Sequence, residues 1–146
     1  MESLINYLHT HVPQTKNMGF EAGSYHDKGL TLHAPLSLNL NDKQTAFGGT
    51  LATLCTIAGW TMVSMICREE HLTIDIVVAE SQIKYRFPVR SDPIVAYATR
   101  PDNKNIQSLI NGLRNHGKGS IGINVVVDGD KPGAVQFNGT YVAKVL

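Results

Sequence analysis

The clearest pattern of hydrophobic and polar positions runs from Leu30 to Leu40, where every even position is apolar and every odd one is polar or proline. A period of two predicts a β-strand with one buried face. Pro35 cannot donate a hydrogen bond to a neighbouring strand, so we expect this strand to be a sheet edge or to be irregular there. A preceding strand is expected over 18–26, with a tight turn at 27–29.

The longest apolar segment, residues 46–67, contains no charged residue. Its length would allow a transmembrane helix, but it holds three glycines, four threonines and one serine, and the amphipathic strands around it need a core. Four hydroxyl side chains share an arc of roughly 80° on this helix: Thr50, Thr53, Thr61 and Ser64. We therefore predict a central, buried helix and no membrane span, with hydroxyls bonded back to helix carbonyls.

After this helix, hydrophobic residues alternate on even positions over 74–78 and on odd positions over 83–87. The change of phase predicts a β-bulge near Glu80–Gln82, which would bend the strand as a sheet curling around a helix requires. Further strands are expected over 94–99, 121–127 and 135–145, the last two joined by a hairpin. Amphipathic patterns also predict helices over 3–12, capped by Ser3 and ended by Pro13, and over 103–116.

The elements combine into one α+β domain over residues 1–146, with a long central helix wrapped by a curved antiparallel sheet of five or six strands. One helix cannot cover both faces and both edges of such a sheet. We therefore expect identical chains to pair, as a homodimer or homotetramer.

Composition places the chain among soluble cytoplasmic proteins. The N-terminus lacks the positive start and cleavage site of a signal peptide. Cys55 and Cys67 lie in the same predicted helix, about 18 Å apart, so they cannot pair with each other and are expected to be reduced, buried thiols. His9 and His11 point to different sides of a helix, and no further ligands recur at a suitable spacing, so we expect no metal and no cofactor.

The net charge of +1 is unevenly distributed. Residues 1–83 carry four basic and eight acidic side chains, whereas residues 84–118 carry seven basic and two acidic ones. This basic stretch is either a solvated face or a docking surface for phosphates or for an acidic carrier protein. It has little aromatic interleaving, which argues against nucleic acid as a partner.

The stretch Asn41 to Leu51 carries the chemistry. Gly48 and Gly49 stand at the start of the buried helix, where they either remove side chains so that a ligand can approach the backbone or only permit a tight junction. Free N–H groups and the helix dipole at such a start can bind a carbonyl oxygen and stabilise an oxyanion forming on it.

This stretch, with Gly59-Trp60 on the helix, resembles the hotdog thioesterase superfamily over roughly residues 15–145. It is most similar to the thioesterase-like domain that some bacteria fuse C-terminal to an acetyltransferase domain. The resemblance implies the hotdog fold and places Asn41, seven residues before Gly48, at the position of the active-site Asn in the acyl-CoA thioesterase branch.

The sequence also departs from that superfamily. Many members have His before the Gly pair, where this chain has Phe47, and Asp or Glu as general base where it has Thr56. A Ser that assists in one relative corresponds to Val78. Glu80, at the bulge, is our preferred substitute for the missing carboxylate, because a bulge could turn it inward.

Asp42 and Asp75 are the other acids near enough in sequence to serve. For all three carboxylates, a solvated surface position is the simpler interpretation. The absence of a Gly-x-Ser-x-Gly elbow argues against the α/β-hydrolase type of thioesterase.

The resemblance thus implies an acyl-thioester hydrolase in fatty acid metabolism, with acyl-CoA or acyl-carrier protein as substrate. Its expected catalytic residues are Asn41, Gly49, Thr56 and Glu80. Its expected substrate-binding residues are Phe47, Gly48, Arg86, Arg90 and Arg100. The alternatives are a non-catalytic acyl-thioester-binding module, favoured by the missing carboxylate, or an oligomerisation module.

Overall fold

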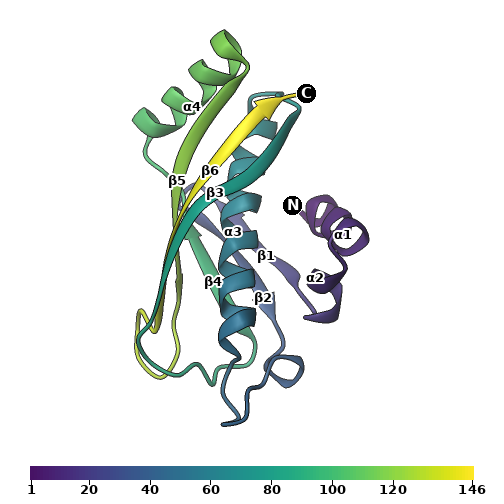
Figure 1. Ribbon diagram of the computed structural model, residues 1–146, viewed down its shortest axis with the longest axis vertical. Coiled ribbons are helices and arrows are strands. Elements are labelled where there is room, and N and C mark those ends of the chain that lie inside the picture. Colours follow the sequence, from purple (N-terminus) through teal and green to yellow (C-terminus); the bar gives the residue numbers. More distant parts are fainter.

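The protein has six strands and four α-helices, described over residues 1–146 by a computed structural model (Figure 1). In chain order the elements are α1 (Glu2–His11), α2 (Pro13–Asn17), β1 (Glu21–His26), β2 (Gly29–Ala34), a 3-10 turn (Leu36–Leu38), α3 (Gly48–Glu69), β3 (Ile74–Tyr85), β4 (Ile94–Thr99), α4 (Asn103–His116), β5 (Lys118–Val127) and β6 (Val135–Val145).

All six strands form one antiparallel sheet in the order β1-β2-β4-β5-β6-β3. The sheet is strongly curved, and α3 runs along its concave side (Figure 1). β4 pairs only with the last residues of β5, and α4 packs beside the first half of β5 that β4 leaves uncovered. The predicted α+β fold, a long central helix within a curved antiparallel sheet, is confirmed.

Helix α3 is buried because its apolar residues face the sheet. Leu54, Ala58 and Met62 are fully buried and belong to the same core as Ile123 and Val125 of β5. α3 is the one helix long and apolar enough to cross a membrane, but 67% of its most apolar stretch is buried inside the fold. It is therefore the core helix of the domain, as the sequence predicts.

A close contact fixes α3 against β6. The Tyr141 hydroxyl donates a hydrogen bond of 2.7 Å to the carbonyl of Thr56. A Cβ on residue 59 would lie 2.2 Å from the Tyr141 oxygen, so only glycine fits there. This contact explains a glycine in the middle of a long helix, where glycine otherwise costs about 1 kcal/mol.

The segment from Leu30 to Leu40 departs from the prediction. β2 ends at Ala34 and lies between β1 and β4, so it is no edge strand. The 3-10 turn then reverses the pattern, because Leu38 is 61% exposed and Asn39 only 3% exposed. The expected irregularity at Pro35 is therefore a complete end to the strand.

β3 lies at an edge of the sheet and contains a bulge, as predicted, but the bulge lies just before the expected Glu80–Gln82. Its register against β6 shifts between Val78 and Glu80, so that Ala79 is the additional residue. Val77 on this edge is 58% exposed. The bulge does not turn Glu80 inward: its side chain is exposed and makes no hydrogen bond or ion pair within the chain.

The predicted helix ends are partly correct. α4 spans Asn103–His116 as expected, and the Asp102 carboxylate caps it by accepting from the amide of Asn105 (2.9 Å). α1 begins at Glu2, however, so Ser3 is not its cap. Pro13 ends α1 and also begins α2, because proline suits the first position of a helix.

Both cysteines are buried and unpaired, as predicted. Burial raises the pKa of the Cys55 thiol to about 12. Burial, together with the negative charge of Glu70, raises the pKa of Cys67 to about 11. Both side chains therefore remain neutral thiols at physiological pH and act as small apolar groups in the core.

Candidate active site

Helix α3 begins without a side-chain cap. Phe47 occupies the N-cap position and has no polar side-chain atom to accept from the first turn. The first helical hydrogen bond runs from the Leu51 amide to the Phe47 carbonyl (3.1 Å), and the amides of Gly48, Gly49 and Thr50 have no acceptor in the chain. Because the positive end of the helix dipole lies at the same place, these amides can bind an electron-rich oxygen.

The helix start is nevertheless held firmly. The buried Asn39 accepts a hydrogen bond from the Phe47 amide at its carbonyl (2.7 Å) and from the Thr50 hydroxyl at its side chain (2.9 Å). Its own carboxamide donates to the carbonyls of Met18 (2.9 Å) and Pro35 (2.7 Å). The first turn of α3 thus keeps a fixed direction while its amides stay open.

A groove of about 380 Å³ lies beside this helix start. Its walls are the loop before α3 and the segment that follows β3, which are joined by a hydrogen bond from the Ala46 amide to the Val89 carbonyl (2.8 Å). The lining residues are Asn41, Thr45, Ala46, Gly48, Leu51, Tyr85, Arg86, Phe87, Pro88 and Val89. None of them is a carboxylate.

The ring of Phe47 covers the exposed side of Gly49. A Cβ on residue 49 would lie 2.4 Å from the nearest Phe47 ring carbon, and the Phe47 side chain is 52% exposed. The ring is thus a solvent-exposed neighbour of Gly49, and it does not line the groove. The sequence pointed to Phe47 as a ligand contact, and the structure places it beside Gly48 and Gly49.

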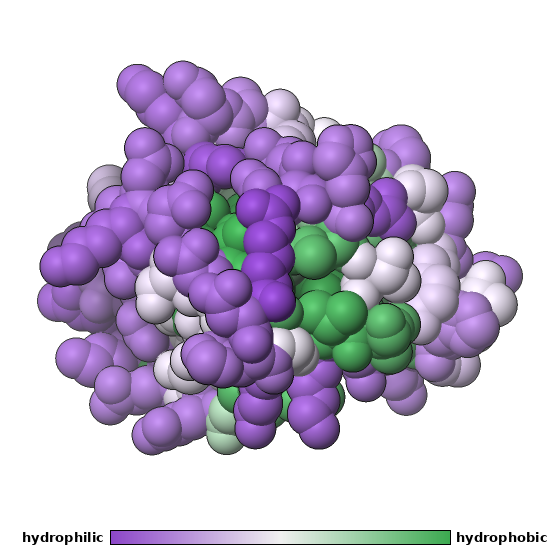
Figure 2. Space-filling view, turned by 90° about the horizontal axis from the view of Figure 1, so that it is seen from above, coloured by the Kyte–Doolittle hydropathy of each residue, from purple (hydrophilic) through white to green (hydrophobic).

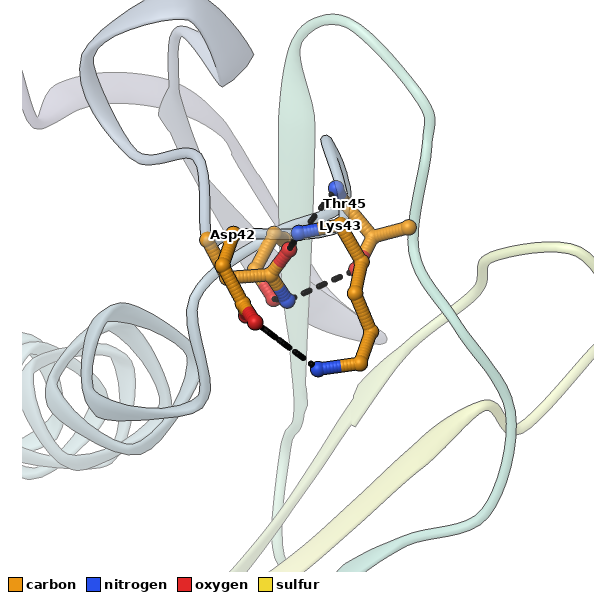
Figure 3. Close-up of polar contacts among 5 residues, drawn as sticks. Asp42, Lys43 and Thr45 are labelled. Atoms are coloured by element: carbon orange, nitrogen blue, oxygen red, sulfur yellow. Dashed lines mark hydrogen bonds and ion pairs between the residues drawn. The ribbon is translucent and has the colours of Figure 1, made fainter.

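Asn41 shapes the loop that forms one wall of the groove. Figure 3 shows this loop, with Asp42, Lys43 and Thr45 labelled. Its side-chain oxygen accepts from the amides of Lys43 (2.9 Å) and Thr45 (3.1 Å), and its amide group donates to the Thr45 hydroxyl (2.8 Å) and the Ala46 carbonyl (3.4 Å). Because both lone pairs and both N–H groups have partners, Asn41 acts on the loop itself. This arrangement differs from the expected contact with the reacting group.

Tyr85, the last residue of β3, enters the groove from the opposite wall. Its ring lies over the first residue of α3, where a Cβ on Gly48 would be 3.7 Å from a ring carbon. Its hydroxyl makes one long hydrogen bond, 3.4 Å, to the Gly48 carbonyl. The sequence indicated Tyr85 only as part of a strand pattern, because nothing in the pattern shows that β3 ends opposite Gly48.

Thr56, one of the expected catalytic residues, lies outside the groove. Its hydroxyl donates to the carbonyl of Ala52 (2.8 Å), one turn earlier in the helix, and it does not line the groove. The hydroxyls of Thr53, Thr61 and Ser64 donate to their own helix in the same way, as expected from the sequence. Thr50 departs from that prediction, because its hydroxyl donates to the buried side chain of Asn39 instead (2.9 Å).

The candidate carboxylates lie away from the helix start. Asp42 is exposed and forms an ion pair with Lys43 (3.2 Å; Figure 3). Asp75 lines a different cavity, near the C-terminus. Glu80, exposed on the edge strand, does not line the groove either. In the single chain, therefore, none of these three carboxylates lies where it could act as the general base that relatives have at the position of Thr56.

The three arginines expected to bind substrate separate into different regions. Arg86 lines the groove and has no acidic partner. Arg90 is paired with Asp130. Arg100 is hydrogen-bonded to Glu69 (3.0 Å) at the other end of α3, a helix of 22 residues and about 33 Å, so it cannot join Arg86 within one chain.

A second, larger cavity of about 520 Å³ lies near the C-terminus, between α1, α3 and β3. Its walls are mainly apolar and include Leu4, Trp60, Ile74, Ile76 and Leu146. Figure 2 shows that end of the molecule, with an exposed hydrophobic patch between hydrophilic side chains.

Comparison with known proteins identifies the fold and the family. Residues 1–145 match the family model described as "Putative thioesterase (yiiD_Cterm)". The crystal structure of a protein of unknown function from Chlorobaculum tepidum has 34% sequence identity and a TM-score of 0.92, over 99% of this chain and 93% of that chain.

Another structure, of a protein named a putative thioesterase from Shewanella oneidensis, has 28% identity and a TM-score of 0.88, over 99% of this chain and 96% of that one. A thioesterase from Pseudomonas aeruginosa shares the fold at 17% identity, with a TM-score of 0.69 over 100% of this chain and 95% of that one. The fold is thus the hotdog fold of thioesterases, and the chain belongs to the putative thioesterase family that its sequence resembles.

Proposed function

We propose that this protein hydrolyses acyl thioesters of CoA or of acyl-carrier protein, with the thioester carbonyl bound at the start of α3. One observation carries the proposal: in a chain of a thioesterase family, the amides of Gly48, Gly49 and Thr50 have no acceptor in the chain, and Gly48 lines a groove. When water attacks a thioester, negative charge develops on the carbonyl oxygen. Fixed N–H donors at a helix start stabilise that charge without reorganising.

The groove walls have separate roles in this proposal. Asn41 holds the loop wall, so it is a positioning residue, and Phe47 moves aside as the acyl thioester enters. Arg86, unpaired at the groove, attracts the phosphates of CoA or of the carrier protein's phosphopantetheine arm. The basic stretch thus contributes through Arg86, whereas Arg90 and Arg100 already have acidic partners.

The assembly that we propose is a homodimer paired along β3. This edge strand has one side without a neighbouring strand, and its Val77 and Val78 side chains are exposed. Antiparallel pairing of two β3 strands about a two-fold axis would place Ile74 of one chain near Tyr85 of its partner. The apolar cavity near the C-terminus of one chain would then continue the groove of the other and could hold the acyl chain.

Light scattering tests this assembly. We expect a dimer at micromolar concentration and a shift towards monomer in Val77→Lys, because a charge on the unpaired edge opposes strand pairing. Lys84→Gln, a substitution on the same strand that introduces no charge, should leave the dimer intact. A monomeric wild-type protein would contradict the pairing.

Hydrolysis assays test the activity. Purified protein is incubated with acyl-CoAs of short, medium and long chains and with the matching acyl-carrier proteins, and the released thiol is measured. Release above the uncatalysed rate with at least one substrate, lost in Gly49→Val, is the expected result. Absence of release from the whole panel would overturn the hydrolase proposal.

The second candidate function is a non-catalytic module that binds acyl thioesters. It is favoured by the lack of a carboxylate among the groove residues. Thermal stabilisation by acyl-CoA without thiol release would support this alternative over a hydrolase. A cytoplasmic location remains our expectation for either function.

A further inference from the structure

Tyr85 is the groove side chain best placed to reach a bound thioester. Its hydroxyl has only the 3.4 Å contact with the Gly48 carbonyl, which lies at the long limit of hydrogen bonding. Its side chain is 53% exposed, so it can turn towards a ligand. Gly48 lies beside the ring, lines the same groove, and its amide has no acceptor in the chain.

The other polar groups of the groove are engaged elsewhere. All hydrogen-bonding positions of Asn41 are occupied within its loop, and the Thr45 hydroxyl accepts from Asn41. Arg86 is a charged group suited to phosphate. Thr45 is buried, with 8% exposure, so the Tyr85 phenol is the exposed uncharged side-chain donor of the groove that can turn towards a carbonyl oxygen.

From this placement we propose that Tyr85 is a catalytic residue, which donates a hydrogen bond from its phenol to the thioester carbonyl oxygen, together with the open amides of α3. This inference rests on the proposed function and names a residue of that same site. The phenol keeps its proton throughout and stabilises the oxyanion as the water oxygen bonds to the carbonyl carbon and releases a proton to bulk water. The C–S bond then breaks as the carbonyl re-forms, and the leaving thiolate takes up a proton from bulk water.

The first test is kinetic. Tyr85→Phe keeps the ring that covers Gly48 and removes only the hydroxyl. We expect kcat to fall about 10²-fold with little change in KM, because the donor acts most strongly on the charge that develops during reaction. Tyr97→Phe is the matched control: Tyr97 lies on β4, outside the groove, and its hydroxyl has no partner in the chain, so its kcat should remain that of the wild type.

The second test does not depend on turnover. Calorimetry compares two non-hydrolysable CoA derivatives, a ketone in which CH2 replaces the thioester sulfur and a thioether in which CH2 replaces the carbonyl. Tyr85→Phe should weaken binding of the ketone about three- to tenfold and leave binding of the thioether unchanged, because only the ketone offers the oxygen that accepts the bond.

The outcomes separate the two proposals. Wild-type hydrolysis with an unchanged kcat in Tyr85→Phe, or equal weakening of both analogues, overturns the role of Tyr85 and leaves the hydrolase standing. Selective weakening of the ketone in a protein without hydrolysis keeps Tyr85 as a carbonyl donor of a binding module. If the wild type binds neither analogue, the site itself is wrong and the Tyr85 proposal fails with it.

Discussion

The two ends of helix α3 differ in how their polar groups are satisfied. At the C-terminal end, Glu69 accepts from Tyr25 and from Arg100 (3.0 Å), and Glu70 forms an ion pair with Arg114 (2.8 Å). At the N-terminal end, three amides have no partner and the residue before the helix is Phe47. The first end is closed by side chains from β1, from the residue after β4 and from α4, and the second lies beside a groove.

The two ends of α3 therefore have different roles: one holds the fold together and the other is available to a ligand. A helix end that is closed by ion pairs holds neighbouring elements together and has little capacity left for a ligand. The open amides of a helix end need water or a ligand as hydrogen-bond acceptor. Leaving them without an acceptor in the chain lowers stability, and such features are found at functional sites. Changes at the open end should therefore affect activity, and changes at the closed end should affect stability.

The largest effect is expected for Gly49→Val at the open end. A side chain here occupies the approach to the amides, and its steric conflict is with the Phe47 ring, which can move outward. We predict a fall in kcat of about 10²–10³ with acyl-CoA while the melting temperature is maintained. Gly122→Val on β5, where nothing lies within 4 Å of the added Cβ, is the control that should keep full activity.

Asn41→Ala should have the next largest effect. Loss of the carboxamide removes four hydrogen bonds that shape the loop wall of the groove. We therefore predict that kcat/KM falls about tenfold, which corresponds to a loss of about 1.4 kcal/mol of transition-state stabilisation. Circular dichroism and a panel of acyl-CoAs check this. Unchanged kcat/KM would show that the loop does not shape the site; Asn138→Ala, on β6 outside this groove, serves as comparison.

A smaller effect is predicted for Arg86→Gln. Removing the unpaired charge should raise KM for acyl-CoA about three- to tenfold without changing kcat, and added salt should mimic it. Arg90→Gln should have little effect, because Asp130 already compensates that charge. If the two variants behave alike, the pairing of Arg90 does not matter and the basic stretch acts as one surface.

The smallest effect is predicted at the closed end, for Glu69→Gln. Desolvation raises the pKa of Glu69, but hydrogen bonds from Tyr25 and Arg100 and the charge of Arg100 outweigh it, so the pKa in the folded protein lies below the usual value of a glutamate. A lowered folded pKa stabilises the protein above the unfolded pKa, and this contribution is lost as the pH falls through the folded value.

Because Glu69 is partly exposed, we expect the variant to lose only about 0.5–1 kcal/mol at pH 7. Urea unfolding of wild type and variant should show the difference at pH 7 and a smaller one at pH 3, with kcat/KM unchanged throughout. A loss of activity equal to that of Gly49→Val would remove the distinction between the two ends.

The sequence predicts those features that depend on local periodicity. The long helix, the bulge in β3 and the span of α4 all follow from the spacing of apolar residues, because packing against one core preserves that spacing. After Pro35 the pattern of buried and exposed residues is reversed, and the sequence does not predict this. It depends on hydrogen bonds that the Asn39 side chain donates to the carbonyls of Met18 and Pro35.

The same limit applies to the candidate site: its local sequence features were predictable, and its contacts between distant residues were not. Gly48 and Gly49 are recognisable from the glycine pair at the start of an apolar helix. Tyr85 and the pairing of Arg100 with Glu69 depend on which residues the sheet brings opposite each end of α3, and a one-dimensional pattern does not contain that information. Asn41 was found by resemblance, but its network within the loop is visible only in three dimensions.

The back-bonded hydroxyls of α3 change how this helix would look to another molecule. Thr53 and Thr56 are polar residues, yet each hydroxyl donates its hydrogen to a carbonyl of its own helix. The methyl group of each side chain is then the main surface left for contact. A molecule lying along that side meets methyl groups and few free hydrogen bonds. Selection along that side then depends on shape and length, so substitutions that change the side-chain volume at these two positions should change which molecules fit.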